Sequence, residues 1–259
     1  MKELPEYLYE FDVNGYIVMP SVICEGDIKL LLDYWSANLT EHPVRDVNFD
    51  WGDEWRRLID RDQVFNFLCE IFNFRFRLDH MFCADERFVS AGARLRHGPS
   101  MFEDGIYYFV RNQKIHSGLV AIQYSLIDTS IHVNHFCCIP GSHRGNFPVP
   151  ENIRTLSNNS MARHIPLRAG DALIFSEALV HGTCVVKCSG PRRAVFARYM
   201  NAHSYFRRPP QHDLITTLPK TPNHAQERHE SFDPRLLSPR QLKIVVEPAY
   251  ARDHPDFKG

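Results

Sequence analysis

The sequence predicts a mainly β protein with flanking helices, arranged as a sandwich or a barrel. Short runs rich in β-branched and aromatic residues follow one another from about residue 90, and turn-forming residues separate them. The first 90 residues instead show the spacing of buried helices. A chain of 259 residues with 44% hydrophobic and 12% aromatic side chains is large enough to bury a sizeable core.

Two helices are predicted in the N-terminal part. Asp27 is placed to cap a helix over residues 28–39, in which Ile28, Leu31, Leu32 and Trp35 recur on one face. Residues 64–72 (VFNFLCEIF) predict a second, buried helix.

Six strands are predicted in the part that follows, at 106–110, 119–127, 136–139, 172–175, 184–187 and 194–199. Turn formers lie between them at Asn112, 140–142, 169–171 and 189–191. The whole chain, 1–259, is predicted to be one domain, with a helical part over 1–90, a β core over 90–203 and a C-terminal extension over 204–259. That extension is rich in Pro, Arg and His, and it either covers the site entrance or forms a surface tail.

Charge and cysteine usage exclude several classes of protein. With 30 basic and 31 acidic residues, no global field favours a nucleic acid polymer or a membrane surface. No 18-residue apolar run is present, and the N-terminus lacks an apolar signal core. The seven cysteines are odd in number and form no CxxC pair, so reduced thiols in a cytoplasmic protein are expected. Cys184 and Cys188 are four residues apart, but without a second pair they do not predict a zinc site.

Three residues in a fixed order carry the predicted chemistry. His116 precedes an apolar run, His181 follows 65 residues later, and Arg192 lies 11 residues beyond that. Two histidines from different strands, with further coordination positions open, suit a mononuclear iron(II) site. An arginine beyond them can bind a carboxylate through two parallel hydrogen bonds. One histidine among 14 is weak evidence, whereas the ordered set is more specific.

Several phrases of the chain resemble those of the phytanoyl-CoA dioxygenase family, and together they cover roughly residues 8–205. These phrases are FDVNGYIVMPSVI, CCIPGSHRGNF at 137–147, LRAGDALIF at 167–175 and LVHGT at 179–183. The resemblance implies a double-stranded β-helix, or jelly roll, that binds Fe(II) and 2-oxoglutarate and uses O2. It implies that His116 and His181 are the iron ligands and that Arg192 anchors 2-oxoglutarate. Arg193 is a weaker candidate, because neighbours on a strand face opposite ways.

One position departs from the family pattern. The usual motif is His-X-Asp, in which the aspartate is the third iron ligand, but here the residues are His116, Ser117 and Gly118. Glycine cannot ligate a metal, so an external ligand could take that position. This pattern is similar to that of iron/2-oxoglutarate halogenases, in which chloride binds iron. The resemblance therefore implies a halogenase that chlorinates an unactivated C–H bond through an iron(IV)-oxo/chloride intermediate.

Two other functions remain open. The chain could be a hydroxylase or other oxidase whose third iron position is filled by water or by a carboxylate such as Glu177, four residues before His181. It could also be a non-catalytic binding protein that retains the fold. The retained histidines and arginine argue against the non-catalytic alternative.

The expected partner is a small-molecule substrate, with a nucleotide or an amino acid as candidates. Basic and aromatic residues that precede His116 could line the entrance and suit an anionic, ring-bearing ligand; they are Arg96, His97, Tyr107, Tyr108 and Arg111. Glu177 could accept a hydrogen bond from the substrate. The alternatives are ordinary strand packing for the tyrosines and solvation for the arginines.

Three other histidines are expected to lie outside the iron site. His143 follows the turn at Gly141 and is predicted to have a structural role. His132 and His135 are predicted to lie in a surface loop, with a role in covering the substrate as the alternative.

Overall fold

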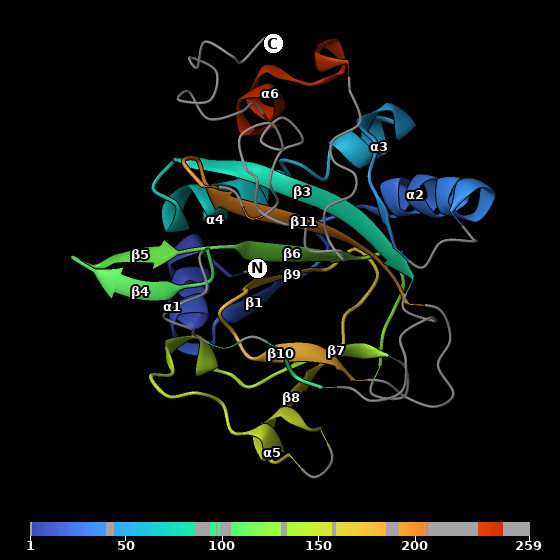
Figure 1. Cartoon of the computed structure of the whole chain (residues 1–259). Helices are drawn as coiled ribbons and strands as arrows, with labels where there is room; N and C mark the ends of the chain where they lie inside the picture. Colours follow the sequence, from blue (N-terminus) through green and yellow to red (C-terminus); the bar gives the residue numbers. More distant parts are fainter. Residues whose placement is uncertain are drawn as a thin grey trace, which may run out of the picture.

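The computed structural model of the chain describes residues 2–39, 44–85, 94–96, 98, 105–130, 134–156, 159–184, 192–204, 206 and 233–245. Two antiparallel sheets lie face to face, and helices cover the outer face of the larger sheet (Figure 1). The predicted jelly-roll fold, mainly β with flanking helices, is thereby confirmed.

The larger sheet has the strand order β1-β9-β6-β11-β3-β2. Its strands are β1 (Tyr16–Met19), β2 (Val44–Asp46), β3 (Phe76–Asp85), β6 (Val120–Ser125), β9 (Ala172–Ser176) and β11 (Arg193–Asn201). The smaller sheet has the order β10-β7-β8 and consists of β7 (His135–Cys138), β8 (Arg163–Ile165) and β10 (His181–Cys184). A separate hairpin, β4 (Tyr108–Arg111) with β5 (Lys114–Ser117), projects from one end of the molecule (Figure 1).

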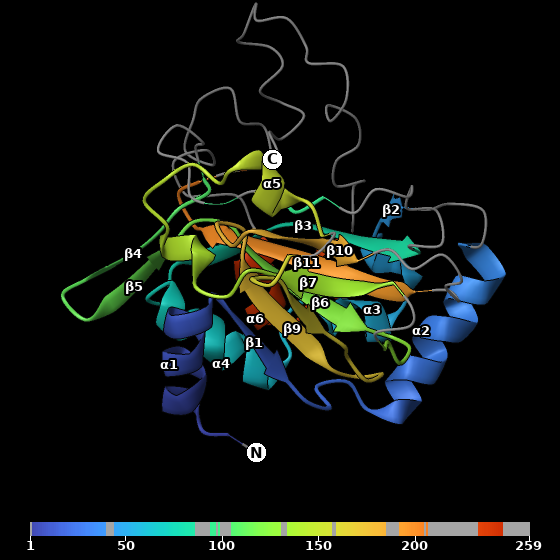
Figure 2. The same cartoon turned by 90° about the horizontal axis from the view of Figure 1, so that it is seen from below.

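The helices lie at the periphery of the sheets. They are α1 (Leu4–Asn14), α2 (Glu25–Asn38), α3 (Asp53–Arg56), α4 (Asp62–Ile71), α5 (Glu151–Arg154) and α6 (Pro239–Val245), with 3-10 turns η1 (Phe49–Trp51), η3 (Ser142–Arg144) and η5 (Pro234–Leu236). Figure 2 shows α1 and α2 near opposite ends of the larger sheet. None of the helices described is long and apolar enough to span a bilayer.

Alternation along β11 separates the two cores. Val195, Ala197 and Tyr199 are buried in the cluster that the helices form on the outer face of the larger sheet. A second apolar cluster fills part of the space between the two sheets, and it includes Phe136 of β7 and Phe175 of β9. Since successive residues of a strand face opposite sides, the even-numbered residues of β11 face the smaller sheet.

An extra residue in β3 interrupts its pairing with β11. Arg198 of β11 is opposite His80, but the next residue, Tyr199, is opposite Leu78, so Asp79 has no partner on β11. Such a β-bulge bends the strand and changes which residues share a face. The Asp79 carboxylate accepts hydrogen bonds from the Arg77 side chain and from the backbone N–H of Phe206.

The N-terminal part differs from its prediction. Residues 1–90 contribute β1, β2 and β3 to the larger sheet in addition to the helices. The helix predicted from residue 28 begins at Glu25, and Asp27 does not cap it. The Asp27 carboxylate instead binds the guanidinium groups of Arg57 and Arg61, which hold its pKa below the usual range despite burial.

Two further predictions concern the second half of the chain. The strand predicted at 184–187 is β10, which begins at His181 and is described only as far as Cys184. In the C-terminal extension, α6 packs on the helix-covered side of β3, and Gln241 bonds the Asp60 carboxylate there. Residues 233–245 of the extension therefore lie against the outer face of the larger sheet (Figure 1), whereas Phe206 lies apart from them and donates its backbone N–H to Asp79.

His143 joins the turn after β7 to the end of α1. Its ring is fully buried, Nε2 donates to the carbonyl oxygen of Asp12 at 3.1 Å, and the ring meets Tyr108 edge-on. A Cβ on Gly15 would lie 2.5 Å from Nδ1 of this ring, so the contact requires glycine there. Burial lowers the pKa of His143 to about 4. This placement agrees with the predicted structural role.

The buried His143 predicts a stability change with pH. Unfolded histidine titrates near 6.5, so between pH 6.5 and 4 the unfolded chain binds more protons and the free energy of unfolding falls as pH falls. We expect a loss of about 3 kcal/mol over this window, and a flatter profile in His143→Gln. Urea unfolding at several pH values measures it. The exposed His203→Gln is the control, and a wild-type slope in His143→Gln would contradict the assignment.

Candidate functional site

His181 is the first residue of β10 and faces the space between the sheets. Its Nδ1 lies 2.7 Å from the carbonyl oxygen of Leu179. A carbonyl can only accept a hydrogen bond, so Nδ1 carries the proton and Nε2 presents its lone pair. The rings of Phe136 and Phe175 lie 5.6 Å and 4.6 Å from the imidazole and fix its plane. A metal ligand held in one tautomer by a backbone carbonyl has this geometry.

Glu177 follows β9 and faces Nε2 of His181. Its Oε2 lies 3.7 Å from His181 Nε2, and its side chain is 1% exposed. The other oxygen, Oε1, lies 3.0 Å from Nε of Arg198 on β11. Two ligands that are each about 2.1 Å from one ion lie roughly 3 to 4 Å apart. The imidazole and the carboxylate therefore fit one metal ion, and iron(II) accepts this donor pair.

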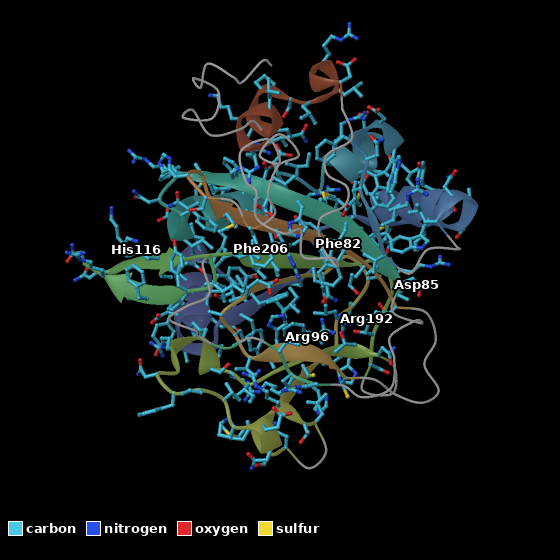
Figure 3. All side chains as sticks on the ribbon, in the orientation of Figure 1. Phe82, Asp85, Arg96, His116, Arg192 and Phe206 are labelled. Atoms are coloured by element: carbon cyan, nitrogen blue, oxygen red, sulfur yellow. The ribbon has the colours of Figure 1, made fainter. Side chains whose placement is uncertain are left out.

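Arg192 lies directly before β11 and is fully buried between the sheets (Figure 3). Its two terminal nitrogens donate to Thr183 Oγ1 at 3.2 Å and to Gln123 Oε1 at 2.8 Å. Thr183 is two residues after His181 on β10, so the two side chains share a face. Both of these acceptors are uncharged and they orient the guanidinium, which can bind a carboxylate through two parallel hydrogen bonds.

The neighbouring Arg193 faces the other way. Its guanidinium lies over the Trp35 ring at 5.9 Å, donates to Ser36 Oγ at 3.3 Å and lies 3.7 Å from Asp85. The alternation expected along this strand therefore places Arg192, and not Arg193, between the sheets.

The open end of the space between the sheets combines cations with aromatic rings. The backbone of Arg96 pairs with that of His181 through hydrogen bonds of 2.7 and 3.1 Å, so both side chains face the same side. The rings of Phe82 and Phe196 stack at 5.0 Å and are half-buried, and Arg198 lies 5.4 Å from the Phe82 ring. A planar, negatively charged ligand would find matching groups here. His97, also predicted to bind substrate, lies outside the described residues.

His116 is not brought to His181. It lies on the projecting β4–β5 hairpin, is exposed, and stacks on Phe109 at 4.8 Å with the rings 10° apart. Figure 3 shows it on that hairpin, well separated from Arg192. The structure therefore does not bring together the two histidines that were expected to hold one iron, because the β4–β5 hairpin projects away from the two sheets.

Three other residues that were predicted to contact the substrate also lie on or beside the β4–β5 hairpin. Tyr107 and Arg111 are exposed on or beside the hairpin. Tyr108 is buried and donates to Asp12 Oδ1 at 2.7 Å, and its pKa is raised by burial and by this carboxylate. These three residues lie apart from His181, so the geometry gives them packing and surface positions in place of the predicted substrate contacts.

Gly118 is required by packing. A Cβ at this position would lie 2.1 Å from the carbonyl oxygen of Gly105, and Leu119 N–H donates to that same oxygen at 2.7 Å. Two backbone segments touch here, and a side chain would separate them. The absence of a carboxylate at residue 118 thus has a structural explanation, which is an alternative to the predicted halide position at Gly118.

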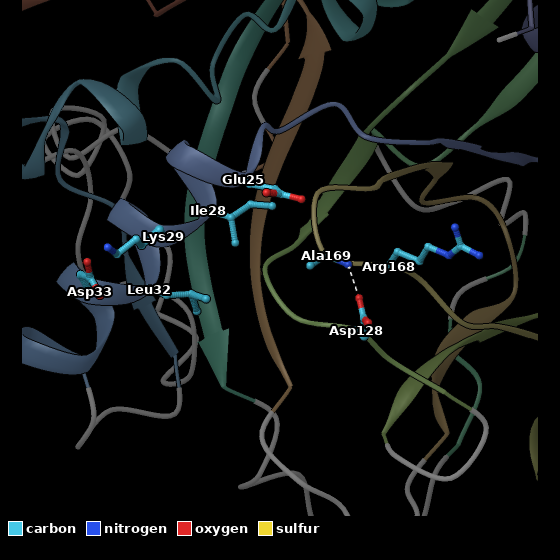
Figure 4. A pocket seen from close by; sticks show the side chains of 8 residues that line it. All are labelled: Glu25, Ile28, Lys29, Leu32, Asp33, Asp128, Arg168 and Ala169. Carbon is cyan, nitrogen blue, oxygen red and sulfur yellow. Dashed lines mark hydrogen bonds between the residues drawn. The ribbon is translucent and has the colours of Figure 1, made fainter.

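A surface pocket of about 510 Å³ lies elsewhere, between α2 and the loop before β9 (Figure 4). Ile28 and Leu32 of α2 form its apolar side, and Arg168 and Asp128 lie opposite. It contains none of the residues that surround His181, so it is separate from the candidate site.

Sequence reasoning missed four of the groups around this site: Gln123, Thr183, Phe196 and Arg198. Gln123 and Thr183 could have been found by the two-residue spacing that places them on the inner faces of β6 and β10. Phe196 and Arg198 follow Arg192 at the same spacing. The missing information was which strands are neighbours.

Comparison with known proteins identifies the family. The two face-to-face antiparallel sheets define a jelly-roll protein, and its candidate site lies between them at His181 and Arg192. Residues 40–194, more than half of the chain, match the family described as phytanoyl-CoA dioxygenase (PhyH). The chain belongs to this family, so the resemblance noted from sequence is confirmed. A comparison with curated proteins gives no match.

Solved structures share the fold. HygX from Streptomyces hygroscopicus, with nickel and 2-oxoglutarate bound, superposes with a TM-score of 0.70 at 23% identity, covering 82% of this chain and 94% of HygX. The epimerase SnoN, in complex with Fe3+, alpha ketoglutarate and nogalamycin RO, gives 0.57 at 18% identity, covering 89% and 95%. AviO1 from Streptomyces viridochromogenes Tue57 gives 0.59 at 14% identity, covering 78% and 96%. At such identities the likeness establishes the fold alone.

The backbone contact at Gly118 predicts a large cost for any side chain. We expect Gly118→Ala to lower the free energy of unfolding by about 2–4 kcal/mol, because a backbone oxygen cannot move aside as a side chain can. Gly26→Ala is the control, since nothing lies within 4 Å of a Cβ at that helical position. It should leave stability unchanged or raise it by up to about 1 kcal/mol. Denaturant unfolding of both variants measures the difference, and equal stabilities would contradict the packing role.

Proposed function

We propose that this chain is an Fe(II)/2-oxoglutarate-dependent oxygenase that oxidises a small molecule. His181 and Glu177 would hold the iron, and Arg192 would bind the distal carboxylate of 2-oxoglutarate. The observation that carries the proposal is the position of His181 Nε2, which carries a lone pair and faces a buried carboxylate at 3.7 Å. Fe(II) and 2-oxoglutarate bound there would supply the activation of O2 that C–H oxidation needs.

The residues of the chain have separate tasks in this proposal. The Leu179 carbonyl keeps the proton of His181 on Nδ1, so Nε2 is the ring nitrogen that would bind the metal. Arg198 contacts Oε1 of Glu177, while Oε2 is the oxygen near His181, so the arginine holds the carboxylate in place. Gln123 and Thr183 hold the guanidinium of Arg192 in one orientation. Phe136 and Phe175 exclude water from one side of the imidazole.

Oxidation without halogen transfer is favoured. The case for chlorination depended on Gly118 as a vacant ligand position, and Gly118 is in backbone contact with Gly105. Glu177 also places an acidic group beside His181, where a bound chloride would be repelled. The relatives described above are named with iron, nickel and 2-oxoglutarate. Hydroxylation or a related oxidation therefore replaces halogenation in the proposal, and chloride is not included as a cofactor.

The substrate proposed is a small, ring-bearing molecule with an anionic group. Arg96 and Arg198 supply positive charge near His181, and Phe82 and Phe196 supply a stacked aromatic surface. Crystal structures of HygX with hygromycin B and of SnoN with nogalamycin RO support a small molecule as the class of substrate. A nucleotide fits these groups better than an unmodified aliphatic amino acid.

The ligand assignment predicts different effects for two histidines. We expect His181→Ala to weaken Fe(II) binding by roughly 100-fold or more, and Glu177→Gln to weaken it by about 10- to 100-fold, because each removes a ligand. His116→Ala should bind as the wild type does. Anaerobic titration with Fe(II) and 2-oxoglutarate, followed by the metal-to-ligand absorption band, measures affinity, and succinate formation in air measures turnover. His97→Ala belongs in the series, because His97 directly follows Arg96 in the chain.

Three outcomes of that titration would change the proposal. Loss of iron binding in His116→Ala but not in His181→Ala would restore the original ligand pair. A chloride-dependent shift of the absorption band would restore halogenation. Wild-type protein that is folded but binds no iron would support a non-catalytic binding protein.

The position of Arg192 predicts a specific effect on the co-substrate. Arg192→Lys keeps the charge but loses the two-pronged hydrogen bond, so the Kd of 2-oxoglutarate should rise about 10- to 100-fold, as expected for charged hydrogen bonds. Arg193→Lys is the matched control on the opposite face and should leave the Kd unchanged. Affinity measured at fixed Fe(II) decides between them. Equal effects in both variants would exclude Arg192 as the anchor.

A further inference from the structure

Two histidines and a cysteine gather on the outer face of the smaller sheet. His135 lies on β7, His164 on β8 and Cys184 on β10, so three adjacent strands contribute one residue each. One ligand atom from each residue lies within 4.8 Å of the other two. His135 was expected in a surface loop, but it is buried in β7.

The strand register explains why these residues meet. His135 is directly opposite Cys184, and His164 is opposite Cys137, which is two residues from His135. Side chains at such positions project from the same face of a sheet. The two histidines are 29 residues apart in the chain, so their proximity cannot be recognised from a short sequence motif.

The cluster is distinct from the candidate iron site. His181 is opposite Cys138 on the same two strands, three positions along from the pair of His135 and Cys184. Because this separation is odd, the two pairs project from opposite faces of the sheet. His181 and Cys138 therefore face the space between the sheets, and the cluster faces away from it. Cys184 packs with Cys137 in a separate apolar group on that outer side.

The distances fit a tetrahedral cation of the zinc type. His135 Nε2 and His164 Nδ1 are 2.7 Å apart, which is a hydrogen-bond distance. Zinc ligands at about 2.1 Å for nitrogen and 2.3 Å for sulfur lie roughly 3.4 to 3.6 Å from one another. The two ring nitrogens would have to separate by about 0.7 Å, and a sulfur–nitrogen distance at the 4.8 Å limit of the cluster would have to shorten by about 1 Å. His164 is exposed and has room to move.

We propose that His135, His164 and Cys184 form a second metal site that binds a zinc-type divalent cation and ties together the three strands of the smaller sheet. The thiolate and two imidazoles are a ligand set that zinc prefers, and the half-buried sulfur leaves a fourth position for water. Because β10 also carries His181, the cation would stabilise the strand on which the candidate iron ligand lies.

Cobalt(II) tests this site without depending on the iron site. A thiolate bound to Co(II) gives a charge-transfer absorption band, which a site made of His181 and Glu177 cannot produce. We expect one equivalent of Co(II) to give this band in the full-length wild type and in His181→Ala, and Zn(II) to remove it. Cys184→Ser should abolish the band, and His164→Ala should weaken Co(II) binding by about 10- to 100-fold.

Controls make each outcome decisive. Cys24→Ser removes an exposed thiol elsewhere and should behave as the wild type. Zn(II) should raise the Tm of the wild type and of Cys24→Ser, but not that of Cys184→Ser, and circular dichroism checks that every variant is folded. A band that persists in Cys184→Ser, or folded wild type that gives no band with Co(II), would overturn the proposal. Loss of the band in His181→Ala would mean that the two sites are one.

Discussion

Strand β11 pairs with β3 along one edge and with β6 along the other, and its side-chain alternation determines both the core and the site. Odd-numbered residues such as Val195 and Tyr199 pack under the helices, while Phe196 and Arg198 face the smaller sheet. Arg192, at the start of this strand, is buried where it reaches Gln123 and Thr183. A shift of one residue in this pairing would bury the polar set under the helices and expose the apolar set.

The fold and part of the site could be predicted from the sequence, because they depend on local patterns. Alternating apolar residues and the turns between them indicated the β core. His181 was identified within the family phrase LVHGT, and Arg192 was identified by its position 11 residues beyond His181. The family resemblance selected Arg192 over Arg193, and strand alternation allowed only one of the two to face inward; the structure places Arg192 between the sheets.

The structure does not bring the other predicted ligand, His116, to His181, and sequence order could not indicate this because it does not show which strands are neighbours. His116 precedes β6 closely, yet its hairpin projects from the sheets, and Arg96 is the residue that pairs with His181. Gly118 was interpreted as leaving one iron coordination position open, because glycine has no side chain that can bind a metal. The backbone of Gly105, a contact that no local pattern indicates, is the reason for that glycine. The cluster of His135, His164 and Cys184 was hidden in the same way, since its members come from three strands.

The bulge at Asp79 has a consequence for comparing this chain with its relatives. Leu78 and Met81 are three residues apart, yet both pack under the helices, because the extra residue lies between them. A relative that lacks this residue would have a continuous β3, in which the position of Leu78 stays opposite that of Tyr199 and still faces the helices. An alignment through β3 therefore needs a one-residue gap at Asp79, because without the gap the positions over 76–78 would be matched to positions on the opposite face of the sheet.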